Sequence, residues 1–311
     1  MNWYLTTLAL LALLQFSATP LTPVAPALLS WHREGTGTSS TEFVNLKKSS
    51  SHEKAPVRML NDSLGPVLTS EAALMIDPVS KAVLWEKDAD EVRAIASITK
   101  LMSVIVALET HIDLTTVVTI TQDDYSDFGY NNFVVGEEVK AADLLAATLI
   151  ASDNTAVTAL ARATGLPHES FVSSMNQKAR GLGLTHTRFA DPTGLSNENI
   201  STAREVLVFA AHAFAVPDVA ALVRRRTYDL TSVSGTAHEL KTTDQLIGGI
   251  LTVIAGKTGY VTDSGYNIVA QVTRAAEHPV LGVVLGSATN PDRFQDFKML
   301  SFWVWDNFTW Q

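Results

Sequence analysis

Three short groups of residues stand in an order that could build one catalytic site: Ser97-Ile98-Thr99-Lys100, Ser152-Asp153-Asn154 and Lys257-Thr258-Gly259. A serine hydroxyl becomes a strong nucleophile when a neighbouring base removes its proton. Residues three apart at the start of a helix lie on one face, so this spacing places the hydroxyl of Ser97 beside the amine of Lys100. The pair predicts covalent catalysis, with Ser97 as nucleophile and Lys100 as general base.

Lys100 can act as a base only if its pKa falls far below the usual value of about 10.4. Burial removes the solvation of an ammonium group and a second cation repels its proton, so both lower the pKa of a lysine. Lys257 is the expected second cation. The prediction therefore requires the third group of residues to lie close to the first in the folded chain.

The second group is expected on a turn between two helices. There Ser152 and Asn154 can both enter a cleft while Asp153 points into the protein. Ser152 is expected to shuttle a proton to the leaving group, because a hydroxyl both accepts and donates. Asn154 is expected to hold a backbone amide of the substrate.

The third group is expected on an edge strand, where a glycine lets a substrate peptide approach the backbone. Lys257 and Thr258 are expected to bind a substrate carboxylate, with Gly259 beside them. The backbone N–H groups of Ser97 and Tyr260 are expected to form an oxyanion hole.

Each group taken alone has a simpler interpretation. Ser-x-x-Lys also occurs at residues 51–54 and Ser-x-Asn at residues 174–176. Ser97 could merely lie in the first turn of a helix, the second group could cap the next helix, and the third could be a turn. The ordered occurrence of all three, including the rarer Lys-Thr-Gly, favours the catalytic interpretation.

The apolar pattern predicts strands at both ends of the folded part and helices between them. Helices are predicted at residues 97–109, 141–150, 155–163, 169–182, 203–214 and 292–307, and strands at 72–76, 82–86, 268–272 and 280–285. This order indicates one sheet built from both ends, with a helical lobe from the middle. The aromatic residues near the C-terminus are predicted to pack in a core rather than to touch a membrane: Trp303, Trp305, Phe308 and Trp310.

Beyond the three groups, the sequence resembles the low-molecular-mass penicillin-binding proteins, which are serine D-alanyl-D-alanine carboxypeptidases and endopeptidases. The stretch Ile95–Met102 is similar to the nucleophile helix of that family, and Asp191–Ser196 with Ser201–Ala203 is similar to the loop after its helical lobe. The resemblance covers roughly residues 70 to 300. Val261 departs from it, because the family often has threonine there.

The resemblance implies an α/β (α+β) fold of the β-lactamase and DD-peptidase type. In that fold a mostly antiparallel sheet is flanked by helices, and the active site lies between the sheet and an all-helical lobe. The implied reaction is hydrolysis of D-Ala-D-Xaa bonds in peptidoglycan stem peptides through an acyl-enzyme on Ser97. β-Lactams are the implied inhibitors, and no metal or organic cofactor is implied.

The ends of the chain give expectations about location and activity. Residues 1–27, an apolar run followed by small residues and prolines, are typical of a signal peptide, although no Lys or Arg precedes the run. Residues 28–66 are polar and predict a flexible tether, and residues 67–311 predict the catalytic domain. An extracytoplasmic location, in the periplasm or cell envelope, is therefore expected. The chain ends soon after its last predicted helix, so no C-terminal β-domain is expected, which resembles the endopeptidase branch of the family.

Composition and missing motifs exclude several other classes. The net charge of −9 disfavours nucleic-acid binding. The absence of cysteine excludes disulfides and thiolate chemistry. Neither His-Glu-x-x-His nor Gly-x-Ser-x-Gly occurs, and Leu251 stands where a phosphate-binding loop ending at Lys257 needs glycine.

Two alternatives remain open at this point. A β-lactamase needs a base that activates water for deacylation, and Glu198 is the nearest glutamate at a suitable distance after Ser152. A penicillin sensor or scaffold, acylated without turnover, would need a transmembrane signalling segment. None is visible beyond the signal-like N-terminus.

Overall fold

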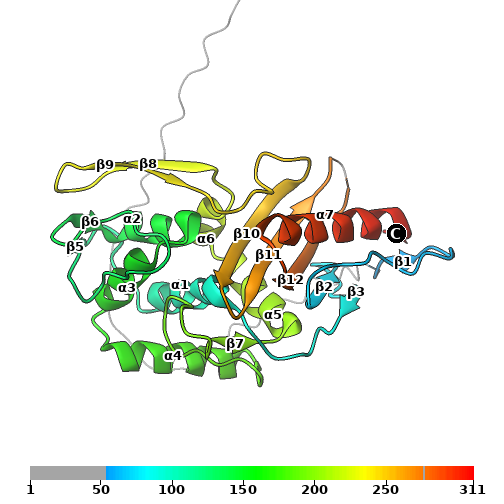
Figure 1. Cartoon of the computed structure of the whole chain (residues 1–311), viewed down its shortest axis with the longest axis horizontal. Helices are drawn as coiled ribbons and strands as arrows, with labels where there is room; N and C mark the ends of the chain where they lie inside the picture. Colours follow the sequence, from blue (N-terminus) through cyan, green and yellow to red (C-terminus); the bar gives the residue numbers. More distant parts are fainter. Residues whose placement is uncertain (1–53, 276) are drawn as a thin grey trace, which may run out of the picture. The chain divides into compact units, whose positions relative to one another are not determined.

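A five-stranded antiparallel sheet organises the folded part of the chain (Figure 1). The structure, a computed structural model, describes residues 54–275 and 277–311. The strand order is β10-β11-β12-β2-β3, and the bounds are Thr252–Val261, Gly265–Thr273, Val280–Ser287, Ala72–Ile76 and Val83–Lys87. Strands from both ends of the folded part share this sheet, so the predicted arrangement is confirmed, and β10 is an edge strand as expected.

Helices cover both faces of the sheet, α7 (Asn290–Asn307) on one and α5 (Ala203–Phe214) on the other. Successive side chains of a strand point to opposite faces. In β2, Leu74 packs in the core shared with α5, whereas Ala73 and Met75 pack in the core shared with α7. The strands therefore consist of nearly continuous apolar residues, because both of their faces are buried.

The helical lobe surrounds α1 (Lys100–Glu109), whose residues 100–107 are all buried. A helix that is buried all round needs partners on every side, and α3, α4 and α5 contact it. The other helices of the lobe are α2 Ala141–Ala146, α3 Asn154–Ala163, α4 His168–Gly181 and α6 Pro217–Leu222. Short two-stranded ladders lie outside the main sheet, among them β4 Arg93–Ala94 with β7 Ile200–Ser201, β5 Val117–Thr119 with β6 Glu138–Lys140, and β8 Thr227–Thr231 with β9 Ala237–Lys241.

Two predicted helices depart from a regular α-helix next to predicted catalytic residues. The first turn of the helix predicted at 97–109 is a 3₁₀ turn, η1 (Ala96–Thr99). The helix predicted at 141–150 ends in a π-helical turn, η2 (Ala147–Ala151), and the chain then turns at Ser152 with φ of 60°. π-Helical turns are rare and often lie at functional sites. The 3₁₀ turn contains Ser97, and the π-helical turn directly precedes Ser152. Both irregular turns therefore change the direction of the backbone next to a predicted catalytic serine.

The folded part begins earlier than residue 67, so the predicted end of the tether is corrected. β1 (Val57–Arg58) pairs with β13 (Phe308–Thr309), and the indole N–H of Trp303 donates to Ser63 Oγ at 2.6 Å. This segment is held in place because it pairs with the C-terminal strand and contacts α7. The predicted signal peptide and most of the tether lie outside the described residues. Within the described residues, no helix is long and apolar enough to cross a bilayer.

The C-terminal aromatic residues pack in the core, as predicted. Trp305 and Phe308 are buried in the apolar cluster beneath α7, and Trp303 and Trp310 pack against it.

Candidate active site

The three groups of residues meet at one hollow of about 630 Å³ between the helical lobe and the sheet. η1 brings Ser97 to it, the turn after η2 brings Ser152 and Asn154, and edge strand β10 brings Thr258 and Gly259. Lys100 and Lys257 are buried behind these residues, with exposures of 0% and 1%. The two lysines therefore reach the hollow through the serine hydroxyls that they contact.

Lys100 has three hydrogen-bond partners. Its Nζ lies 2.8 Å from Ser97 Oγ, 2.7 Å from Asn154 Oδ1 and 2.6 Å from the carbonyl oxygen of Thr193. A neutral amine has two N–H groups and one lone pair. The amide of Asn154 is oriented by its own Nδ2, which donates to the Phe128 carbonyl at 2.7 Å, so two partners of Lys100 can only accept. The lone pair of neutral Lys100 must then face Ser97, the partner that has a proton to give.

Burial lowers the pKa of Lys100 to about 7, and the carboxylates of Asp153 and Asp191 partly oppose this shift. The sequence predicted that a second cation, Lys257, would share in this effect. Burial, the other predicted cause, lowers the pKa of Lys100, and the charged groups that shift this pKa are the two carboxylates rather than Lys257. The cation of Lys100 does lower the pKa of Lys257, after the larger effect of burial. The amine of Lys100 is thus available as a base near neutral pH.

A loop held by Asp191 positions the carbonyl of Thr193. The carboxylate of Asp191 accepts from the backbone N–H groups of Thr193, Gly194 and Ser196 at 2.6, 2.8 and 2.9 Å. Burial raises the pKa of Asp191, but these hydrogen bonds outweigh it and the pKa is lowered. Gly194, with φ of 83°, packs so closely that a Cβ atom would lie 2.1 Å from the carbonyl oxygen of Ala96. The loop therefore also supports the turn that carries Ser97.

Asp153 points into the protein, as predicted, and anchors the second group. Its Oδ1 accepts from the backbone N–H of Ala156 at 2.7 Å, which caps α3, and its Oδ2 accepts from Asn132 Nδ2 at 2.8 Å. Asn154 is held by the same loop, since its backbone N–H donates to the Tyr130 carbonyl at 3.0 Å. The segment around residues 128–132 thus fixes the amide that contacts Lys100.

Lys257 donates to Ser152 Oγ at 2.7 Å and to the carbonyl of Thr258 at 3.0 Å. Because Ser152 accepts from Lys257, its own hydroxyl proton is free to point into the hollow. Thr258 Oγ1 lies 2.5 Å from Thr243 Oγ1, which fixes it on the wall of the hollow. Lys257, Ser152 and Thr258 therefore form one polar chain along β10.

Gly259 has a packing role that the sequence did not predict. A Cβ atom there would lie 2.8 Å from the carbonyl oxygen of Ile95 and 3.1 Å from the backbone nitrogen of Ser97. This glycine permits a close approach between β10 and the turn that carries Ser97. Tyr260, the next residue, lines the same hollow as Ser97.

Arg293 of α7 is a wall residue that the sequence did not reveal. Its Nη1 donates to the Gly259 carbonyl at 3.0 Å and to the Asn267 carbonyl at 3.2 Å, and it lines the hollow. A single arginine in an amphipathic helix carries no signal of its own; its position 36 residues after Lys257 places it here only because α7 packs back over the sheet. Within the described residues, no group of three His, Asp or Glu side chains could hold a metal ion.

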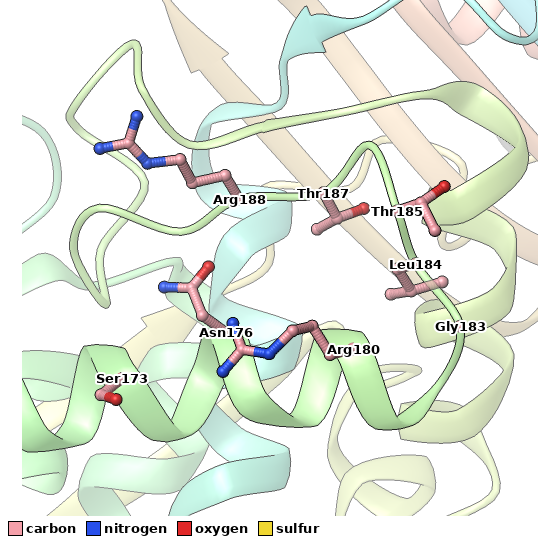
Figure 2. A pocket seen from close by; sticks show the side chains of 8 residues that line it. All are labelled: Ser173, Asn176, Arg180, Gly183, Leu184, Thr185, Thr187 and Arg188. Carbon is pink, nitrogen blue, oxygen red and sulfur yellow. The ribbon is translucent and has the colours of Figure 1, made fainter.

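A second hollow of about 670 Å³ lies between α4 and the segment that follows it (Figure 2). Asn176 and Arg180 project from α4, and Thr185, Thr187 and Arg188 come from the facing segment. It contains none of the residues of the three groups, so the chemistry predicted from the sequence belongs to the first hollow.

The chain matches a known protein family in sequence. The profile described as D-alanyl-D-alanine carboxypeptidase matches residues 60–289. The chain belongs to this family. The family and the fold predicted from the motifs are thereby confirmed.

Individual members of the D-alanyl-D-alanine carboxypeptidase family match most of the chain. A D-alanyl-D-alanine endopeptidase of Pseudomonas aeruginosa is 30% identical over 85% of this chain and 86% of its own length. The D-alanyl-D-alanine carboxypeptidase DacC of Escherichia coli is 32% identical over 76% of this chain and 62% of its own length. The structure of the Streptomyces K15 DD-transpeptidase superposes with a TM-score of 0.72 at 25% identity, covering 78% of this chain and 100% of that one.

Proposed function

We propose that this chain is a serine DD-peptidase that hydrolyses D-Ala-D-Xaa bonds of peptidoglycan stem peptides through an acyl-enzyme on Ser97. The observation that carries the proposal is the contact between Ser97 Oγ and the buried amine of Lys100, at 2.8 Å. The other two partners of Lys100 accept only, so its lone pair is aimed at the serine.

Acylation uses the residues in a definite order. Lys100 takes the hydroxyl proton of Ser97 while the Ser97 Oγ–carbonyl carbon bond forms. The developing oxyanion is stabilised by the backbone N–H groups of Ser97 and Tyr260, and donors of this kind lower such barriers by about 3 to 4 kcal/mol. The C–N bond to the D-Xaa residue then breaks, and its amine leaves with a proton from Ser152, which Lys257 replenishes. Water then attacks the ester carbonyl and its proton passes through Ser152 back to Lys257. As the ester C–O bond breaks, Lys100 returns its proton to Ser97 Oγ, which releases the acyl product as a carboxylic acid and restores both lysines.

The cations around the hollow suit a substrate with a free carboxylate. Thr258 and Arg293 line the wall, and Lys257 adds its charge from behind Thr258. In this arrangement Thr258 and Arg293 contact the carboxylate and Lys257 acts through its field, while Asn154 borders the path of the acyl chain. β-Lactams, which carry both a reactive amide and a carboxylate, fit the same positions as inhibitors.

Endopeptidase cleavage of cross-links and carboxypeptidase trimming are both within this reaction, since both break a D-Ala-D-Xaa bond. The identity to a named endopeptidase over 85% of the chain supports the first, and that to a named carboxypeptidase over 76% supports the second. An extracytoplasmic location is part of the proposal because peptidoglycan lies outside the cytoplasm. The signal-like residues 1–27 support export.

Glu198, the candidate base for deacylation in the β-lactamase alternative, lies outside the hollow. Glu198 is 64% exposed and pairs with Arg188 at 3.0 Å. It does not contribute to the hollow that Ser97 and Ser152 line.

The test is incubation of the purified protein with cross-linked muropeptide dimers and with monomers that end in D-Ala-D-Ala. Conversion of dimers to monomers identifies an endopeptidase, and loss of the terminal D-Ala identifies a carboxypeptidase. Rapid turnover of penicillin with no muropeptide cleavage would identify a β-lactamase. Penicillin labelling without either cleavage would identify a sensor.

A further inference from the structure

Asp244, between β9 and β10, is a buried carboxyl group that the proposed reaction does not use. It is 3% exposed, although Thr243 and Gln245 on either side of it line the hollow. Its Oδ1 accepts from the backbone N–H of Leu246 at 2.8 Å, whereas its Oδ2 is buried with no hydrogen-bond partner among the described residues. An asparagine would make the one hydrogen bond equally well. The charge of Asp244 therefore needs a separate explanation.

Asp244 lies directly behind the strand that carries Lys257. A Cβ atom on Gly256, the residue before Lys257, would lie 2.5 Å from Asp244 Oδ2. The glycine at 256 thus leaves room for the carboxyl oxygen against β10. A buried carboxylate is costly unless a cation compensates it. The cations that act on Asp244 are the buried side chains of Arg293 and Lys257.

We propose that Asp244 is a positioning residue that keeps Lys257 protonated and thereby able to supply the proton that Ser152 passes to the leaving group. The charged groups that act on Lys257 come from three elements: Lys100 of α1, Arg293 of α7 and Asp244 of the β9–β10 loop. Burial and the two cations lower the pKa of Lys257, and the carboxylate of Asp244 opposes them.

The effect is reciprocal, as linkage requires. Burial raises the pKa of Asp244 to about 6, and Arg293 and Lys257 hold it below the value that burial alone would give. Asp244 is therefore charged above about pH 6 and supports Lys257 in that range. The carboxylates that act on Lys100 are different ones, Asp153 and Asp191. Asp244 is thus assigned to one lysine of the pair.

The experiment compares Asp244→Asn with the wild type and with Asp229→Asn, the same change on an exposed residue of β8. Lysine-labelled protein is titrated by NMR, and the Lys257 signal is assigned with Lys257→Arg. The pKa of Lys257 is expected to fall by about one unit, a tenfold change in proton affinity, in Asp244→Asn and to stay unchanged in Asp229→Asn. An unchanged pKa of Lys257 in Asp244→Asn, with the Leu246 amide still protected from exchange, overturns the proposal.

A kinetic readout separates this inference from the proposed function on which it rests. In Asp244→Asn the alkaline limb of the muropeptide kcat profile is expected to move to lower pH, while the acid limb, set by Lys100, stays in place. A merely structural role would lower kcat at every pH and move neither limb. Absence of Ser97 acylation in the wild type would refute the proposed function, whereas the NMR titration would still test Asp244.

Discussion

The rate of Ser97 acylation is expected to follow the deprotonation of Lys100. With a pKa of about 7 for Lys100, about half of the molecules carry the neutral amine at pH 7 and about 1% at pH 5. Acylation by saturating penicillin should therefore slow roughly 50-fold between pH 7 and pH 5, with a slope that approaches one decade per pH unit below about pH 6. The sign follows from the role of Lys100, because only the neutral form can accept the serine proton.

The assay is stopped-flow acylation under saturating penicillin, so that changes in binding do not enter the rate. Lys100→Arg serves as the control, since a guanidinium stays protonated over the whole range. Its acylation should be about 100- to 10,000-fold slower, the usual contribution of a general base. A wild-type profile that keeps rising through pH 9 to 10, as an ordinary lysine would give, refutes the assignment of Lys100 as a base activated by burial.

Two further substitutions test the supports of the site. Gly259→Ala should destabilise the fold by roughly 1–3 kcal/mol, because its methyl group meets the backbone of Ile95 and Ser97, and it should slow acylation at least about tenfold. The control Gly181→Ala places its methyl group in open space at the end of α4, so it should change neither stability nor rate. Thermal melting measures the stability, and penicillin acylation measures the rate. Asp191→Asn should lower the free energy of unfolding by roughly 1–3 kcal/mol in denaturant titrations. It should also move the acid limb of the acylation profile to lower pH, because Asp191 raises the pKa of Lys100; a limb that stays in place would show that Asp191 acts only on the loop.

The residues of the three groups could be predicted because their chemistry depends on side-chain type and on local spacing. Ser97 and Lys100 lie three residues apart in the same turn, so their contact needs no knowledge of the rest of the chain. The edge position of β10 could be predicted in the same way, from glycine next to Lys257 and Thr258. The sheet and the helical lobe followed from apolar periodicity, which burial imposes on both.

The contacts that complete the site could not be predicted, because backbone atoms of distant segments make them. The carbonyl of Thr193 and the carbonyl of Phe128 carry no sequence signal, yet together they orient Lys100 and Asn154. The role of Gly259 in letting η1 approach β10 likewise depends on tertiary packing. Burial and a second cation were both predicted to lower the pKa of Lys100, but which of the two does so depends on how the lobe packs around the amine.

The pairing of β1 with β13 could not be predicted from amino-acid composition. Residues 57–63 follow a polar stretch and show no apolar period, so the sequence assigned them to a tether. They are ordered by pairing with the chain's own C-terminus and by hydrogen bonds to side chains of α7. Such pairing between residues about 250 positions apart leaves no local pattern.

The most direct test of the central claim is to find where penicillin attaches. The protein is incubated with penicillin, digested, and the modified peptide is sequenced by mass spectrometry. A single adduct on Ser97, absent from Ser97→Ala and present in Ser51→Ala, is the result predicted. Equal labelling of Ser97→Ala, or an adduct on any other serine, would contradict the assignment of Ser97 as the nucleophile.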